Sequence, residues 1–137
     1  MKAAGFAWPV RVYYEDTDAG GVVYYANYLK FMERARTEWL RALGFEQTAV
    51  LRDYGIKFAV RAIALEYLRP AWFDDQLAIT VEPMEVSGSL IDIAQAVMRD
   101  AETLARGTVK IVCLNTRSFK PVRIPPPISA RITTRTA

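Results

Sequence analysis

The residues with the clearest chemical potential in this chain are aspartates and glycines between Tyr14 and Tyr28. Their sequence is Tyr-Glu-Asp-Thr-Asp-Ala-Gly-Gly-Val-Val-Tyr-Tyr-Ala-Asn-Tyr. Gly20 and Gly21 allow backbone conformations and close approaches that a Cβ would block. A substrate can then reach the unpaired amides that open the following helix, where the positive end of the helix dipole favours a developing negative charge. Because Asp18 stands two residues before these glycines, the segment is predicted to be an active site.

The same residues also fit a purely structural role. Asp and Gly dominate tight turns, so Asp16 and Asp18 would then only shape the chain beside the glycines. The spacing alone does not separate the two interpretations, and both stay open at this point.

The amino-acid composition limits which side chains can act as catalytic groups. The chain contains no histidine, which excludes a Ser-His-Asp or Cys-His arrangement, a histidine general base and a histidine-ligated zinc site. The one cysteine, Cys113, lies in an apolar run and is expected to be a small core residue, because a nucleophilic thiol needs a lowered pKa and a nearby base. Carboxylates and backbone amides remain as catalytic groups.

A strand and a helix must position the Asp18 segment. Residues 8–14 have the β-branched and aromatic content of a strand. A central helix is expected over residues 27–43, because apolar side chains recur with a helical period and Gly44 supplies a stop. A shorter helix is predicted over residues 47–54, ending at Gly55. The apolar face of the central helix is predicted to comprise Tyr28, Phe31, Met32, Ala35, Trp39, Ala42 and Leu43.

Four long strands are predicted in the rest of the chain, over residues 57–68, 76–82, 90–99 and 103–117. Short connections favour neighbouring antiparallel strands, so these four are expected to form a meander. Prolines after residue 120 prevent the sheet from continuing. The chain is therefore predicted to be one α+β domain over residues 1–132, with residues 133–137 as a disordered tail.

The segment around Asp18, followed by Phe-Met-Glu-Arg-Ala-Arg-Thr-Glu from Phe31, resembles the 4-hydroxybenzoyl-CoA thioesterase family. More narrowly, it resembles the YbgC-like acyl-CoA thioesterases associated with the Tol–Pal system. The likeness extends from about Trp8 to about Pro125. It implies a hotdog fold, in which a long central helix is wrapped by a five-stranded antiparallel sheet. It also implies active sites at the interface of a homodimer, and a homotetramer formed as a dimer of dimers.

The resemblance implies roles for two residues. In the family, the aspartate matching Asp18 acts on the thioester carbonyl as nucleophile or general base, and the backbone N–H matching Tyr25 polarises the carbonyl oxygen. The YbgC-like branch commonly carries histidine at the Tyr25 position, whereas tyrosine is more similar to the hydroxybenzoyl-specific branch. The backbone role survives this change and an imidazole role does not, so short aliphatic and aromatic acyl groups both stay open.

The charge distribution indicates a polyanionic partner. The net charge is +3, but seven basic and no acidic residues follow Glu102. The phosphates of coenzyme A or the acidic surface of an acyl carrier protein would fit, whereas nucleic acid is disfavoured because apolar residues separate the charges. Ordinary solvated lysines and arginines are the alternative.

A cytoplasmic protein is expected. A single cysteine gives no sign of an oxidising compartment, and the first residues lack a continuous signal-peptide core. The longest run without a charged side chain, residues 19–29, is too short to cross a bilayer.

The sequence thus predicts an acyl-CoA thioesterase that releases a carboxylic acid and free coenzyme A through Asp18 and the Tyr25 amide, with no metal or redox cofactor. Glu33, at the border of the helix's apolar face, is a second candidate carboxylate; a surface or salt-bridging role is the alternative. A non-catalytic acyl-CoA or acyl-carrier-protein binding module is the main alternative function. A structural protein of a cell-envelope complex is a third.

Overall fold

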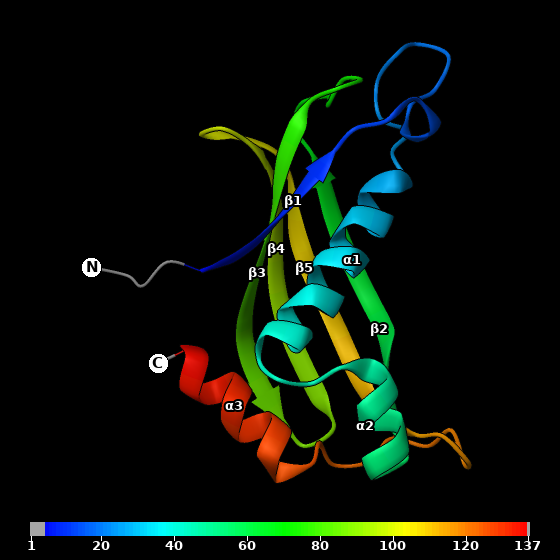
Figure 1. The fold of residues 1–137 in the computed structure, drawn as a ribbon, viewed down its shortest axis with the longest axis vertical. Helices are drawn as coiled ribbons and strands as arrows, with labels where there is room; N and C mark the ends of the chain where they lie inside the picture. Colours follow the sequence, from blue (N-terminus) through cyan, green and yellow to red (C-terminus); the bar gives the residue numbers. More distant parts are fainter. Residues whose placement is uncertain (1–4, 137) are drawn as a thin grey trace.

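A long helix, α1 (Asn27–Ala42), lies along a curved five-stranded antiparallel sheet (Figure 1). The computed structural model describes residues 5–136, with side chains up to residue 133. Helix α2 (Gln47–Tyr54) follows α1, with the bounds that the sequence predicts, and ends at Gly55 in the left-handed region. This arrangement confirms the predicted α+β hotdog fold.

The strands are β1 (Phe6–Arg11), β2 (Ile56–Tyr67), β3 (Gln76–Ser87), β4 (Leu90–Arg99) and β5 (Glu102–Asn115). Their order in the sheet is β1-β3-β4-β5-β2. The predicted meander is confirmed for β3, β4 and β5. The predicted position of β2 beside β3 is wrong, because β2 pairs with β5. Two contacts explain this: β1 occupies the free side of β3, and the amides of Leu68 and Arg69 bond to the Leu104 carbonyl, which holds the end of β2 at β5.

Two strand boundaries differ from the prediction. β1 ends at Arg11, because residues 14–16 form a short 3₁₀ turn instead of continuing the strand. β3 runs to Ser87 through Pro83, where the pairing with β4 shifts register. A bulge is a place where a strand tolerates proline, since the missing N–H costs no ladder hydrogen bond there.

The core lies between α1 and the sheet. Phe31, Met32 and Ala35 are fully buried, as their helical spacing predicts. Ala42 is the exception among the predicted face residues, because it is exposed in the last turn. Gly44, at a φ of 99°, ends the helical segment as expected.

A third helix, α3 (Pro126–Thr136), is missing from the sequence prediction. Ile128 and Ile132, one turn apart, are both fully buried, and the helix packs against β3. Proline is tolerated in a first helical turn, so the proline run opens this helix instead of only ending the sheet. The predicted disordered tail (133–137) begins inside α3, and Ala137 lies outside the described residues.

β2 is an edge strand along its outer side. Within residues 5–136 it pairs only with β5, and Val60, Ile63 and Tyr67 are exposed on it. A bulge at Arg61 shifts its register. No described helix is long and apolar enough to cross a membrane.

Candidate active site

The segment that contains Asp18 is a closed loop between β1 and α1, at one end of the molecule (Figure 1). Thr17 and Val23 form an isolated antiparallel bridge. Inside it, the Asp18 N–H donates to the Val22 carbonyl (2.9 Å), and the Gly21 N–H donates to the Asp18 carbonyl (3.0 Å). Gly21 has a φ of 83°, so the turn uses the conformational freedom of glycine here.

Asp18 is exposed, and one of its carboxylate oxygens is held in place. Oδ1 accepts a hydrogen bond from the Gly20 N–H at 2.8 Å. A Cβ at position 20 would lie 3.2 Å from this same oxygen, so glycine leaves room for the carboxylate. Oδ2 has no hydrogen-bond partner among the described residues. The backbone therefore orients the carboxylate through Oδ1 and leaves Oδ2 unpaired within the described residues.

Asp16 has a different role, because both of its carboxylate oxygens are engaged. Oδ1 accepts from Nδ2 of Asn27 at 2.9 Å, and Oδ2 accepts from the Tyr13 N–H at 2.9 Å. Its carbonyl accepts from the Tyr24 N–H. Since Asn27 is the buried first residue of α1, Asp16 ties the loop to the helix start. Sequence reasoning missed Asn27; a polar residue at the start of an apolar helix face is the signal that could have found it.

The Tyr25 amide lies just before α1, and within residues 5–136 its N–H has no hydrogen-bond acceptor. The Ala26 N–H likewise has no acceptor within residues 5–136, whereas the amides of Asn27 and Tyr28 donate to the carbonyls of Tyr24 and Tyr25. The Tyr67 hydroxyl donates to the Tyr25 carbonyl at 3.1 Å and supports this backbone from β2. The segment just before α1 thus presents two amides without an acceptor within residues 5–136, and the role of the Tyr25 amide stays a prediction.

A cleft of about 280 Å³ is lined by Tyr25, Tyr28 and Tyr67, and Asp18 is not among its lining residues. The rings of Tyr25 and Tyr67 meet edge to face, and Tyr28 lies beside Tyr67. Tyr28 is buried, its hydroxyl accepts the Ala71 N–H at 3.1 Å, and burial raises its pKa, so it packs α1 against β2 and the segment after it while also lining the cleft. Tyr24 contacts the Tyr25 ring but does not line the cleft. No sequence pattern could have found Tyr67, because its partner is far away in the chain.

The structure does not bring Glu33 to this loop. Glu33 lies about 9 Å along α1 from Asn27, at the helical rise per residue. It lines a separate cavity of about 500 Å³ between α1, α2 and the sheet, which contains neither Asp18 nor Tyr25. Asp18 and Tyr25 share one loop, and their joint action on a thioester stays a prediction.

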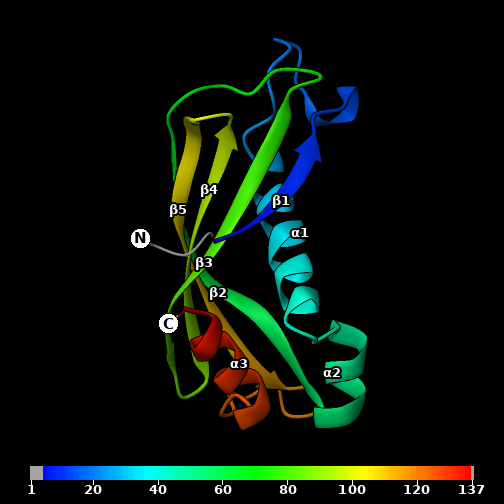
Figure 2. The same cartoon turned by 60° about the vertical axis from the view of Figure 1, so that its left-hand side comes forward.

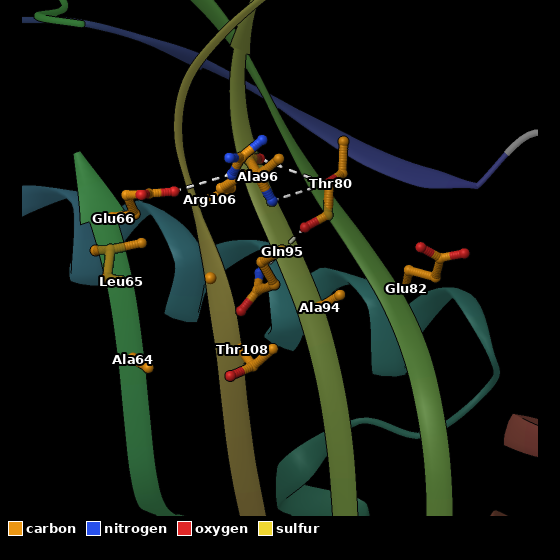
Figure 3. Close-up of a pocket in the computed structure, with 11 residues that line it drawn as sticks. Ala64, Leu65, Glu66, Thr80, Glu82, Ala94, Gln95, Ala96, Arg106 and Thr108 are labelled. Carbon is orange, nitrogen blue, oxygen red and sulfur yellow. Dashed lines mark hydrogen bonds and ion pairs between the residues drawn. The ribbon is translucent and has the colours of Figure 1, made fainter. Parts of the chain in front are cut away.

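A further cavity of about 570 Å³ lies on the sheet face that is turned away from α1 (Figure 3). Small side chains line much of it, among them Ala94 and Ala96 on β4, and an ion pair of 3.1 Å joins Glu66 and Arg106 beside them. Gly107 is required beside it, because a Cβ there would lie 2.0 Å from a backbone oxygen of β2. This face carries none of the residues predicted to be catalytic.

The basic residues after Glu102 do not gather at the Asp18 loop. Arg106 and Lys110 pair with carboxylates on neighbouring strands. The segment 116–122 follows β5 at the end of the molecule opposite to that loop (Figures 1 and 2). Within one protomer, Arg117 and Lys120 are therefore not placed to hold the phosphates of a ligand bound at Tyr25.

Cys113 is fully buried on β5, as predicted for a core residue, and burial raises its pKa to about 11. Below that pH the thiol stays protonated and inaccessible, so we expect negligible labelling by a disulfide reagent such as DTNB at about pH 8 in the folded protein. One thiol should react in denaturant. Rapid labelling of the folded protein, measured by absorbance, would contradict this description of the site.

Residues 12–132 match the family model described as the thioesterase-like superfamily. The chain is 48% identical to the acyl-CoA thioesterase YbgC of Haemophilus influenzae over 130 residues, which cover 95% of this chain and 96% of that protein. The chain belongs to the YbgC acyl-CoA thioesterase family. The acyl-CoA thioester hydrolase YbgC of Escherichia coli O157:H7 is 44% identical over 131 residues, covering 95% and 97%.

A solved structure supports this assignment of the YbgC-family chain. The probable thioesterase of Bartonella henselae matches with a TM-score of 0.84 and 35% identity, covering 89% of this chain and all of that one. The family resemblance predicted from the Asp18 segment is therefore confirmed. The chain is a thioester hydrolase with a hotdog fold, which favours an enzyme over the binding-module and structural interpretations.

Proposed function

We propose that this YbgC-family enzyme hydrolyses acyl-CoA thioesters to a carboxylic acid and free coenzyme A, in the cytoplasm and without a metal or redox cofactor. The names of relatives at 44% and 48% identity support the substrate class. One observation carries the proposal: an amide without an acceptor, that of Tyr25, lies just before α1 on the same loop as Asp18, whose Oδ2 has no partner among the described residues.

In this mechanism, the Tyr25 N–H donates to the thioester carbonyl oxygen. The negative charge that develops on that oxygen is stabilised by this donor and by the positive end of the α1 dipole. Loss of one such donor in other acyl-transfer enzymes costs about 2.7–4 kcal/mol. The role belongs to the backbone, so it does not depend on the side chain at position 25.

Asp18 acts by one of two routes. As a nucleophile, Oδ2 forms a bond to the carbonyl carbon and the coenzyme A thiolate leaves, which gives an anhydride that water then cleaves. As a general base, the carboxylate accepts a proton from the water that attacks the carbon. Both routes consume one water molecule and release one acid and one thiol.

The direct test is a thiol-release assay with straight-chain acyl-CoAs of increasing length, benzoyl-CoA and hydroxybenzoyl-CoA. We expect saturable release of one thiol for each acid formed. An acyl carrier protein thioester in the same panel tests a carrier-protein substrate. Stoichiometric binding without thiol release for every compound would contradict the proposal and favour a binding module.

We also propose a homodimer joined along β2. Its outer edge leaves backbone N–H and C=O groups without strand partners in the described chain, and two copies can satisfy them by continuing the sheet. A dimer of dimers would use the opposite sheet face, where Ala94 and Ala96 allow close approach. Light scattering should then give a dimer or tetramer of the 15.5 kDa chain, and a monomer alone at micromolar concentration would refute both.

A charge on the β2 edge should weaken this association. Val60 is 49% exposed on β2, and Leu51 is 50% exposed on α2. We expect Val60→Glu to shift the mass from light scattering toward the monomer, because a dimer joined along β2 would have to bury or crowd the two new carboxylates. Leu51→Glu is the matched control and should leave the mass unchanged. If both variants had the same mass by light scattering, the interface would not lie along β2.

A further inference from the structure

Tyr67, the last residue of β2, connects the edge of the sheet to the segment just before α1. Its hydroxyl donates to the Tyr25 carbonyl at 3.1 Å, although the two residues are 42 positions apart in the chain. Its ring meets the Tyr25 ring edge to face, with 6.1 Å between the ring centroids, and its centroid lies 5.4 Å from that of Tyr28. One side chain of the sheet thus contacts both the backbone and the ring of Tyr25.

The backbone at the end of β2 holds Tyr67 in place. Tyr67 pairs with Ala105 of β5, which is fully buried. The amides of the next two residues, Leu68 and Arg69, both donate to the carbonyl of the fully buried Leu104, at 2.8 and 3.0 Å. These contacts tie the end of the strand to the core, so the Tyr67 hydroxyl is presented from a rigid element.

The Tyr25 carbonyl depends on Tyr67 for much of its support. Among the described residues it accepts one other hydrogen bond, from the Tyr28 N–H. At 3.3 Å this bond is longer than the usual range for N–H···O, and the Tyr67 hydroxyl is the closer of the two donors. Loss of the hydroxyl would therefore leave the carbonyl with a single weak bond.

Asp16 fixes the backbone on both sides of this carbonyl. Its own carbonyl accepts the Tyr24 N–H at 2.9 Å, and its carboxylate accepts Nδ2 of Asn27 at 2.9 Å. The Tyr25–Ala26 peptide lies between these two fixed points. Tyr67 supplies a third point, from the sheet.

The planarity of the peptide bond turns the position of this carbonyl into a direction for an N–H group. The Tyr25 carbonyl and the Ala26 N–H belong to one trans peptide unit, so they point in opposite directions. The amides of Tyr25 and Ala26 are the two without an acceptor within residues 5–136. A hydroxyl that holds this carbonyl therefore restrains both amides, and it also polarises the peptide unit, which strengthens the Ala26 N–H as a donor.

We propose that Tyr67 is a positioning residue for thioester hydrolysis: its hydroxyl holds the Tyr25–Ala26 peptide so that the amides before α1 stay aimed at the carbonyl oxygen of the substrate. This role rests on the proposed use of the Tyr25 amide in catalysis. Donors that are already fixed stabilise the developing negative charge without reorganising during the reaction. Burial, and to a smaller extent the neighbouring Tyr25 phenol, raise the pKa of Tyr67, so its hydroxyl stays a donor at neutral pH.

Tyr67→Phe tests this role, because it removes the hydroxyl and keeps the ring. In the thiol-release assay we expect kcat to fall about three- to tenfold, the scale of one net hydrogen bond, while KM changes by less than about twofold. The Kd of an alkyl-CoA thioether, which has no carbonyl oxygen, should equal the wild-type value. Tyr54→Phe is the matched control, since Tyr54 is 41% exposed on α2 and Tyr67 is 44% exposed, and it should leave kcat unchanged.

Hydrogen exchange measured by mass spectrometry tests the contact without turnover. Tyr67→Phe should speed the exchange of a peptide over residues 22–29, because the acceptor of the Tyr28 N–H is no longer held. A peptide over β4 should exchange as in the wild type. Because Tyr67 is half exposed and keeps its ring, the thermal midpoint and the mass from light scattering should also stay at wild-type values.

The possible results separate the Tyr67 role from the proposed hydrolysis. Wild-type kcat in Tyr67→Phe would overturn the Tyr67 role and leave hydrolysis intact. A raised KM or thioether Kd with unchanged kcat would show that the hydroxyl binds substrate instead of positioning the backbone. Equal exchange over residues 22–29 would overturn the positioning role whatever the thiol-release assay shows. A wild type that releases no thiol would overturn hydrolysis, and with it any catalytic effect of Tyr67.

Discussion

Asp18→Asn is expected to lower kcat by at least about two orders of magnitude, the low end of what general-base catalysis contributes. The asparagine side chain keeps an oxygen that can accept the Gly20 N–H, now bonded to Oδ1 at 2.8 Å. The loop should therefore keep its shape, while the free Oδ2, the basic and nucleophilic atom, is replaced by an amide nitrogen. Thermal midpoint, oligomeric mass and acyl-CoA binding should stay at wild-type values.

The matched control for this variant is Glu15→Gln, which removes one negative charge from an exposed position of the same loop. Asp16→Asn is less suitable as a control, because both Asp16 oxygens accept hydrogen bonds from N–H groups. An asparagine there places an N–H₂ against one of those donors and should lower the thermal midpoint. Wild-type turnover in a folded Asp18→Asn enzyme would contradict the Asp18 mechanism and would make Glu33 the next candidate carboxylate.

Gly107→Ala is expected to destabilise the fold by about 3 kcal/mol, the upper end of the usual range for overpacking. A Cβ at position 107 would lie 2.0 Å from the Ala64 carbonyl oxygen and 3.0 Å from the Leu65 Cα. These are backbone atoms of β2, so the clash can be relieved only by separating β2 from β5. Chemical denaturation should show a lower midpoint, and light scattering should show a weaker oligomer if β2 is the interface.

Gly5→Ala is the control for the intrinsic effect of replacing glycine. Nothing lies within 4 Å of a Cβ at position 5, so its free energy of unfolding should stay within about 0.5 kcal/mol of wild type. A Gly107→Ala protein as stable as Gly5→Ala would show that β2 and β5 approach less closely than described.

Features that depend on near neighbours in the chain were predictable from the sequence. The helical period of α1, the glycine stops at Gly44 and Gly55 and the strand over residues 90–99 follow from local patterns. The turn after Asp18 was also predictable, because a residue with a positive φ, here Gly21, is usually a glycine, and the two glycines are adjacent in the sequence. Composition alone limited the chemistry to carboxylates and amides, because the chain has no histidine.

The tertiary structure decided which distant segments meet. Nothing local shows that β2 joins β5 instead of β3, since strands with similar apolar content can pair in several orders. The same holds for the Tyr67 hydroxyl on the Tyr25 carbonyl and for Gln95 beneath Arg36, contacts that join residues far apart in the chain. α3 was not predicted, because two isoleucines are too few to show a helical period in the sequence. Their burial becomes evident only from the packing of the helix against β3. The sequence alone thus determined the family and the candidate carboxylate, and long-range packing determined the free edge, the cleft and the second cavity.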